Sequence, residues 1–281
     1  MVYARKYVYI LTGIILSVLA TFGSPAARAT PPDGYTLSWS DEFNLADGAM
    51  PDPKTWNYVD WEPGRVNNEL QSYVTTARHL HIVADAACTD GKALQIRATT
   101  NGKGDYWSGR INTAHKYTTQ YGYIESRIKL THGNGTWPAF WLLGDNDGDV
   151  GWPTCGEVDI MENKGKEPGI NHGTIHGPGY SGAHGPTGIY TLPNGQILSD
   201  GYHTFAVLWE QDKITFYVDD KPYETRTPAN IGDGKTWVYN HPFYIILNLA
   251  IGGDFGGEPD DTTKFPQDLL VDYVRVYKPK S

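Results

Sequence analysis

Short apolar and aromatic runs recur along the whole chain, and turn residues separate them. In residues 121–130 (YGYIESRIKL), the side chains of Ile124, Ser126 and Ile128 alternate with bulkier or charged neighbours. This period of two is typical of a half-buried strand. Similar runs occupy residues 94–98, 157–162, 205–209, 214–218, 243–250 and 270–277. No amphipathic pattern of ten or more residues indicates a helix, so the sequence predicts an all-β sandwich or barrel.

The first 29 residues differ from the rest. Arg5 and Lys6 precede a mostly apolar run at residues 7–22, and residues 27–29 (ARA) form a small-residue cleavage site. This order is typical of a secretory signal peptide, with an uncleaved membrane anchor as the alternative. We therefore expect a secreted, extracellular protein whose residues 30–281 form one domain. No later run reaches the ~18 apolar residues of a membrane helix, so we expect no membrane association after cleavage.

Charge and cysteine content narrow the range of partners. The 281 residues carry a formal charge of −9, and removal of residues 1–29 takes away three basic residues and no acidic one. The remaining 20 basic and 32 acidic residues give a formal net charge of −12, and this negative charge disfavours binding to nucleic acid or anionic lipid. Only Cys88 and Cys155 are present, and the sequence leaves open whether they form a disulfide. We expect a monomer.

Aromatic residues make up 13% of the chain, and all nine tryptophans follow the signal segment. Some of them must belong to the core. Nine is nevertheless many for a core alone, and flat aromatic faces are surfaces on which sugar rings stack.

The most informative segment is residues 156–163, GEVDIMEN, with three acids inside an otherwise apolar strand. In a regular strand Glu157 and Asp159 share one face, whereas Glu162 points to the other. A one-residue bulge near residues 160–161 would return Glu162 to the acidic face. The three carboxyl groups would then repel one another, and at least one pKa should rise.

One ionised and one protonated carboxyl are what retaining glycoside hydrolysis requires. One carboxylate attacks the anomeric carbon, and the other carboxyl protonates the leaving oxygen and later activates water. Two other interpretations remain open on spacing alone. The acids could form the solvated face of an edge strand, or they could bind calcium.

Several motifs together resemble glycoside hydrolase family sixteen, in order along residues 35–278. GEVDIMEN resembles the bulged active-site signature E-x-D-x-x-E of that family. Further matching segments are WSDEF (39–43), NNELQSY (67–73), SGRINT (108–113), WPAFWLLG (137–144), GTIH (173–176) and VDYVRVY (271–277). The bulged form is typical of laminarinase-like endo-1,3-β-glucanases and occurs also in agarases and carrageenases. The resemblance implies a β-jelly-roll of two curved antiparallel sheets with a concave substrate cleft.

The resemblance also implies roles for individual residues. Glu157 matches the nucleophile, Glu162 the general acid/base, and Asp159 the acid between them. Residues that match or flank the sugar-binding cleft are Asn68, Arg110, Trp137, Trp141, Trp152 and His176. The alternatives are core packing for Trp137 and Trp141, a surface ion pair for Arg110, a turn for Asn68 and a structural role for His176.

The family resemblance implies no cofactor for catalysis, but it suggests a structural calcium. Glu42, the carbonyl of Gly91 and Asp272 match its ligands; the alternative is that these groups make ordinary hydrogen bonds. We therefore expect a secreted, retaining endo-glycosidase that hydrolyses internal β-1,3 bonds of β-glucans such as laminarin or curdlan. Alternatives are an agarase, a carrageenase, a mixed-linkage β-glucanase or a non-catalytic β-glucan-binding protein.

Overall fold

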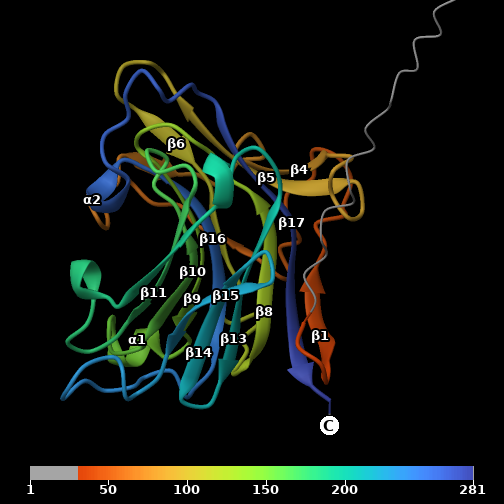
Figure 1. Ribbon diagram of the computed structural model, residues 1–281. Helices are drawn as coiled ribbons and strands as arrows, with labels where there is room; N and C mark the ends of the chain where they lie inside the picture. Colours follow the sequence, from red (N-terminus) through yellow and green to blue (C-terminus); the bar gives the residue numbers. More distant parts are fainter. Residues whose placement is uncertain (1–30, 281) are drawn as a thin grey trace, which may run out of the picture.

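Two β-sheets form the protein in a computed structural model that describes residues 31–280 (Figure 1). The ten-stranded sheet runs in the order β15 (Lys221–Arg226), β14 (Lys213–Val218), β13 (His203–Glu210), β8 (Gly122–Lys129), β17 (Gln267–Pro279), β5 (Lys92–Thr100), β6 (Tyr106–Ser108) and β3 (Gln71–Tyr73), with β1 (Tyr35–Asp41) on β17 and β4 (Leu80–Ala84) on β5. The seven-stranded sheet runs in the order β12 (Thr187–Thr191), β11 (Ile170–His176), β10 (Glu157–Glu162), β9 (Thr136–Gly144), β16 (Phe243–Ile251), β7 (Arg110–Asn112) and β2 (Asn57–Tyr58).

The two-sheet β-jelly-roll architecture expected from the sequence is confirmed, with one difference in strand direction. The described strands pair antiparallel except β3 and β6, which are parallel. Strands β4 and β6 both pair antiparallel with β5 and therefore run in the same direction. The edge strand β3 runs in this direction too, so its pairing with β6 is parallel. The predicted strand runs lie within strands of the structure, except that the run at residues 121–130 extends one residue beyond each end of β8.

Helical segments are few and short within the described residues. They are α1 (Asp147–Val150), α2 (Gly253–Gly256) and the 3₁₀ turns η1 (Gly182–His184) and η2 (Pro193–Gly195). Across residues 31–280 no helix has the length and apolar character needed to cross a membrane. The predicted signal peptide, residues 1–29, lies outside the described residues.

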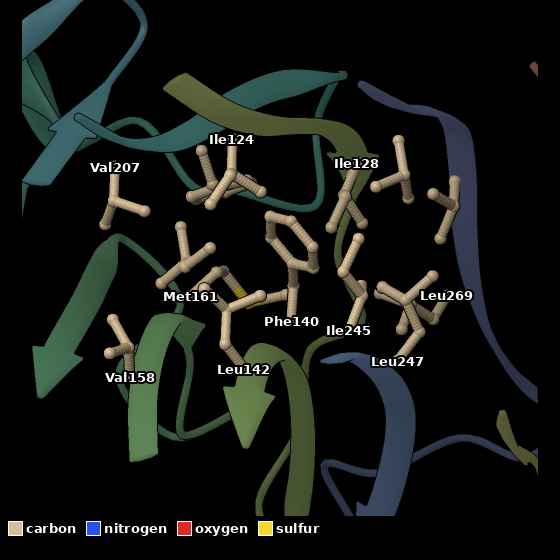
Figure 2. Close-up of a cluster of buried hydrophobic side chains, with 14 of the residues drawn as sticks. Ile124, Ile128, Phe140, Leu142, Val158, Met161, Val207, Ile245, Leu247 and Leu269 are labelled. Carbon is tan, nitrogen blue, oxygen red and sulfur yellow. The ribbon is translucent and has the colours of Figure 1, made fainter. Parts of the chain in front are cut away.

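The core fills the space between the two sheets (Figure 2). Ile124 and Val207 of the ten-stranded sheet meet Phe140, Leu142 and other side chains of the seven-stranded sheet, and all of them are fully excluded from water. Along β9 and β10, the residues between these core positions point to the opposite face of the seven-stranded sheet. The core therefore fixes which residues of that sheet are available to line a cleft.

The two cysteines do not form a disulfide. Cys88 and Cys155 are both buried free thiols. Burial raises the pKa of the Cys155 thiol to about 11, so this group is protonated at neutral pH.

Candidate active site

A bulge in β10 brings its three acids to one face. Against β9, Asp159 pairs with Trp141 and Glu162 pairs with Ala139, while Ile160 has no partner in the register. Ile160 and Met161 are both buried in the core, so the chain advances one residue without changing the acidic face. Glu157, Asp159 and Glu162 consequently line one hollow of about 800 Å³. The bulge expected from the spacing is present where the sequence placed it.

Two indole groups hold the outer glutamates of this row. The Nε1–H of Trp152 donates to Glu157 at 2.5 Å, and the Nε1–H of Trp137 donates to Glu162 at 2.9 Å. Trp137 lies on β9, whereas Trp152 lies in the loop before β10 and is half exposed. Donors of this kind stabilise the ionised carboxylate and fix its orientation. The sequence analysis predicted Trp152 as a residue of the sugar-binding cleft, and the structure adds a direct contact with Glu157.

His176 contacts the central acid. It lies on β11 opposite Glu157, and its Nε2 is 3.0 Å from Oδ2 of Asp159. Both side chains are buried, and the His176 ring is also 6.1 Å from the Trp152 ring. His176 therefore lines the cleft and belongs to the carboxyl cluster.

Burial gives the three carboxyl groups unusual proton affinities. It raises the pKa of Glu157 to about 8, with the neighbouring Asp159 carboxylate adding to the effect. Burial likewise raises the pKa of Glu162 to about 7, while His176 opposes the change. The pKa of Asp159 lies well above its usual range because of burial and then the charge of Glu162. At neutral pH the cluster therefore retains protons, which a general acid requires.

Alternating guanidinium and indole groups form another part of the cleft. The Arg110 guanidinium carbon lies 4.5 Å from the centre of the Trp61 ring and 4.9 Å from that of Trp141. Arg65 also lies over Trp61, with its guanidinium carbon 4.8 Å from the centre of that ring. Arg110 is buried, and its Nε has no hydrogen-bond partner within the described residues. The surface-ion-pair interpretation of Arg110 does not fit this position.

A further buried acid, Glu69, lines the same cleft and was not singled out from the sequence. It accepts hydrogen bonds from Gln71 Nε2 at 2.7 Å and from the Tyr73 hydroxyl at 3.1 Å. Asn248 Nδ2 donates to that same hydroxyl, and Asn248 Oδ1 accepts from the Trp141 indole at 2.7 Å. This network fixes the Trp141 ring. Asn248 was recognisable as the polar residue inside the apolar run 243–250.

The turn before Glu69 alters one expected assignment. Asn67 lines the cleft, whereas Asn68 donates to Asp254 of α2 at 2.8 Å. Both asparagines have positive φ values, 50° and 53°, so the chain turns sharply and their side chains diverge. Asn68 thus holds Asp254, which itself lines the cleft. The same short helix places Phe255 against Trp137, with ring centres 5.2 Å apart.

Comparison with known proteins agrees with this geometry. The family description "Glycosyl hydrolases family 16" matches residues 57–275. The chain belongs to this family. It is 37% identical to glucan endo-1,3-beta-glucosidase A1 of Niallia circulans over 89% of this chain, but that match covers only 39% of the Niallia protein. It is 36% identical to a beta-glucanase of Rhodothermus marinus, over 95% of this chain and 94% of that one.

The fold comparison gives the same family. The structure of endo-beta-1,3-glucanase from Pyrococcus furiosus matches with a TM-score of 0.78 and 43% identity. The match covers 87% of this chain and 94% of that one. The family 16 resemblance deduced from the motifs is therefore confirmed, and the protein is a glycoside hydrolase.

The calcium ligands that the family 16 resemblance suggested do not fit an ion in this chain. Both carboxylate oxygens of Glu42 accept hydrogen bonds from Arg275, at 2.9 and 2.7 Å. Asp272 accepts from Arg127 at 2.5 Å and from Thr89, and the Gly91 carbonyl accepts from the Asp85 amide. Arginines already bind both carboxylates, and a backbone amide already binds the carbonyl, so these oxygens are not a ligand set for Ca²⁺.

One group within the described residues has the spacing of metal ligands, and it lies in the cleft. Ligand atoms of Glu157, Asp159 and His176 all lie within 4.8 Å of one another. These are the groups of the carboxyl cluster itself, so an ion there would compete with a sugar for the same atoms.

Proposed function

We propose that this family 16 protein is a secreted endo-glucanase that hydrolyses internal β-1,3-glucosidic bonds by double displacement with retention. The observation that carries the proposal is the bulged strand β10, which presents Glu157, Asp159 and Glu162 together in a tryptophan-lined cleft. The substrate class rests on the glucan-hydrolysing relatives named above and on the NNELQ segment. Laminarin and curdlan are the expected polymers.

Glu157 serves as the nucleophile in this proposal. The Trp152 indole donor stabilises its ionised form, and a proton held on Asp159 removes the charge that otherwise raises the pKa of Glu157. The carboxylate attacks the anomeric carbon and forms a glycosyl ester as the glycosidic C–O bond breaks. Asp159 keeps its own proton through the cycle.

Glu162 serves as the general acid and then the general base. With a pKa raised to about 7, it is substantially protonated in neutral solution and transfers its proton to the leaving oxygen. It then removes a proton from water, which attacks the anomeric carbon and releases Glu157. Trp137 holds the Glu162 carboxyl at 2.9 Å during both steps.

The rest of the cleft suits a neutral saccharide. The indoles of Trp61, Trp137 and Trp141 offer apolar faces for pyranose rings, and Arg110, Asn67 and Glu69 supply hydrogen-bonding groups. The Arg110 Nε lacks a partner within the described residues but is itself buried, so a sugar hydroxyl can accept from it only if the side chain shifts. Besides these groups and the three acids of β10, Lys164 and Asp254 also line the cleft.

A product profile tests this function. Wild-type protein is incubated with laminarin, curdlan, lichenan, agarose and carrageenan, and reducing ends are measured, with Glu157→Gln as the inactive control. We expect release of oligosaccharides from laminarin and curdlan and none from the galactans. Preferred hydrolysis of agarose or carrageenan would identify one of the alternative activities. No activity on any β-glucan would favour a binding protein.

Stereochemistry tests the mechanism separately. Proton NMR of the first product from laminarin should show the β-anomer before mutarotation. An initial α-anomer would exclude a covalent intermediate at Glu157.

Export and oligomeric state need their own measurements. The predicted signal peptide should be absent from the secreted protein, whose N-terminal sequence would begin at Thr30. Size-exclusion chromatography with light scattering should give the mass of one mature chain. A retained N-terminus or a dimer mass would contradict these two expectations.

A further inference from the structure

A second hollow lies apart from the cleft. It has a volume of about 660 Å³ and is lined by Val74, Thr76, Arg78, His79, Thr99, Thr100, Asn101 and Trp107. None of these residues lines the cleft. The walls come from β5, β6 and the loop between β3 and β4, at one end of the ten-stranded sheet.

Trp107 is the unusual residue of this hollow. Four of the nine tryptophans pack in or against the core: Trp39, Trp56, Trp209 and Trp237. Four others line the cleft: Trp61, Trp137, Trp141 and Trp152. Trp107 belongs to neither set. Within residues 31–280 its indole N–H has no hydrogen-bond partner, and its ring has no aromatic or cationic partner.

The floor of the hollow is uncharged and hydrogen-bonded within the protein. Thr99 pairs with Trp107 across the strands, and His79 connects two threonines, with Nδ1 2.8 Å from Thr76 Oγ1 and Nε2 3.0 Å from Thr99 Oγ1. Burial, then the nearby Arg78 and Arg97, lowers the pKa of His79 to about 4. The imidazole is therefore neutral at neutral pH, and Arg78 is the one charged residue among those lining the hollow.

The backbone connects this hollow with the cleft in two places. Val74 follows Tyr73, whose hydroxyl binds Glu69 and Asn248 in the cleft network. Trp107 precedes Arg110 by three residues, roughly 10 Å of extended chain. Side chains alternate along β3 and β6, so Trp107 lies on the face of this pair opposite to Tyr73. A polymer that leaves the cleft must therefore pass around the edge strand β3 to reach Trp107.

We propose that the hollow around Trp107 is an accessory saccharide-binding site, which holds a second stretch of the β-glucan chain while the cleft holds the first. The half-buried Trp107 indole, its N–H donor and the Arg78 guanidinium are groups that a neutral pyranose can contact. The threonine hydroxyls and the Asn101 amide of the hollow already bind protein groups and shape its walls. The occupant's identity rests on the proposed function, since the polymer in the cleft is what supplies a second segment at high local concentration.

Retention on an insoluble polymer tests the site. In a Glu157→Gln background, which leaves the polymer intact, Trp107→Ala should bind curdlan about tenfold more weakly than the parent, because linked binding is lost. Trp107→Phe keeps an aromatic face and should retain most of the binding. The matched control is Leu37→Ala, which removes an exposed apolar side chain from β1 and should leave retention unchanged. Equal retention of Trp107→Ala and its parent overturns the proposal.

A spectroscopic experiment needs no destabilising substitution. With ¹⁵N-labelled tryptophan, the protein should give nine indole N–H signals, and Trp107→Phe identifies the one from Trp107. Laminarihexaose should shift this signal together with those of the cleft. An unmoved Trp107 signal beside shifting cleft signals overturns the proposal. A response to inorganic phosphate or sulfate, but not to the sugar, identifies an anion site through Arg78 and also overturns it.

The two proposals fail in different ways. Wild-type protein that hydrolyses no β-1,3-glucan contradicts the proposed function. Wild-type protein that hydrolyses curdlan, while Trp107→Ala binds curdlan as well as its parent does, contradicts the accessory site alone.

Discussion

The acids of β10 and two acids on the other side of the molecule's core, Asp272 of β17 and Glu42 directly after β1, are of the same residue types but have different partners. Asp272 and Glu42 each face an arginine, at 2.5 Å from Arg127 and 2.7 Å from Arg275. Glu157 and Glu162 face indole N–H groups instead, and no Lys or Arg ion pair reaches them within the described residues. Arginine pairing keeps a carboxylate charged and inert, whereas burial beside neutral donors makes a carboxyl group that can exchange protons.

The largest effect should come from removing the carboxylate of Glu157. Glu157→Gln keeps the size and the hydrogen bond from Trp152 but cannot form the glycosyl ester. We expect kcat on laminarin to fall by about 10³-fold or more. The thermal midpoint should stay the same or rise, because one buried repulsive charge disappears.

The control for this change is Glu210→Gln, an exposed glutamate paired with Lys213. It should leave both activity and stability unchanged within error. A Glu157→Gln enzyme with wild-type kcat would remove Glu157 from the mechanism.

For Asp272 of the ten-stranded sheet we expect a loss of stability without a loss of activity, the opposite of the result for Glu157. Asp272→Asn leaves Arg127 buried without its anion, and breaking such a pair costs about 3–5 kcal/mol of unfolding free energy. Urea denaturation should show this loss, while kcat on laminarin at a temperature where the variant is folded stays near the wild-type value.

A double variant sharpens the interpretation. Arg127→Met with Asp272→Asn removes both charges, and it should recover part of the lost unfolding free energy. A double variant less stable than Asp272→Asn would show that Arg127 stabilises the fold through other contacts, such as its stacking on Tyr202.

The sequence predicted the acidic face more fully than the rest of the cleft. The alternation of side chains along one strand was enough to place the bulge beside Ile160. Glu157 and Glu162 are five residues apart, and Ile160 and Met161 before Glu162 are both apolar. Glu69 and Asp254 were not found, because their positions depend on a contact between residues 69 and 252 and on the turn at Asn67. The arginine partners of Glu42 and Asp272 are likewise distant in sequence or on another strand, so local motifs did not reveal them.

The donor to Glu157 gives a smaller effect than loss of the carboxylate. Trp152→Phe keeps a ring but removes the N–H, and the lost hydrogen bond to a charged group should lower kcat/KM about tenfold. Because the N–H stabilises the ionised form, its removal raises the pKa of Glu157. The acid limb of the pH–rate profile should therefore move to higher pH.

Trp141→Phe is the matched control for the Trp152 change. The Trp141 N–H donates to the neutral amide of Asn248, so this variant should bind substrate less well without moving the acid limb. Equal displacement of the limb in both variants would contradict a specific role for Trp152.

Stability should depend on pH through the same carboxyls. Folding raises the pKa of Glu157 to about 8 and that of Glu162 to about 7, above the value of 4.5 for free glutamate. The folded protein therefore holds more protons than the unfolded chain between about pH 4.5 and 8, so these groups make the unfolding free energy fall as pH rises through this range. Glu157→Gln should reduce that slope by up to about 1.4 kcal/mol per pH unit. An unchanged slope in urea titrations across this range would show that Glu157 titrates alike in both states.

The smallest effect is expected from calcium. An ion can stabilise the fold only if it binds the folded state more tightly than the unfolded chain. To bind Glu42 and Asp272 it would have to displace the guanidinium groups of Arg275 and Arg127, which are both buried and would then lie beside another cation. Millimolar calcium or EDTA should thus change the thermal midpoint by less than ~1 °C. An increase of several degrees with calcium would show that these arginines move aside and that Glu42 and Asp272 can also exchange their partners.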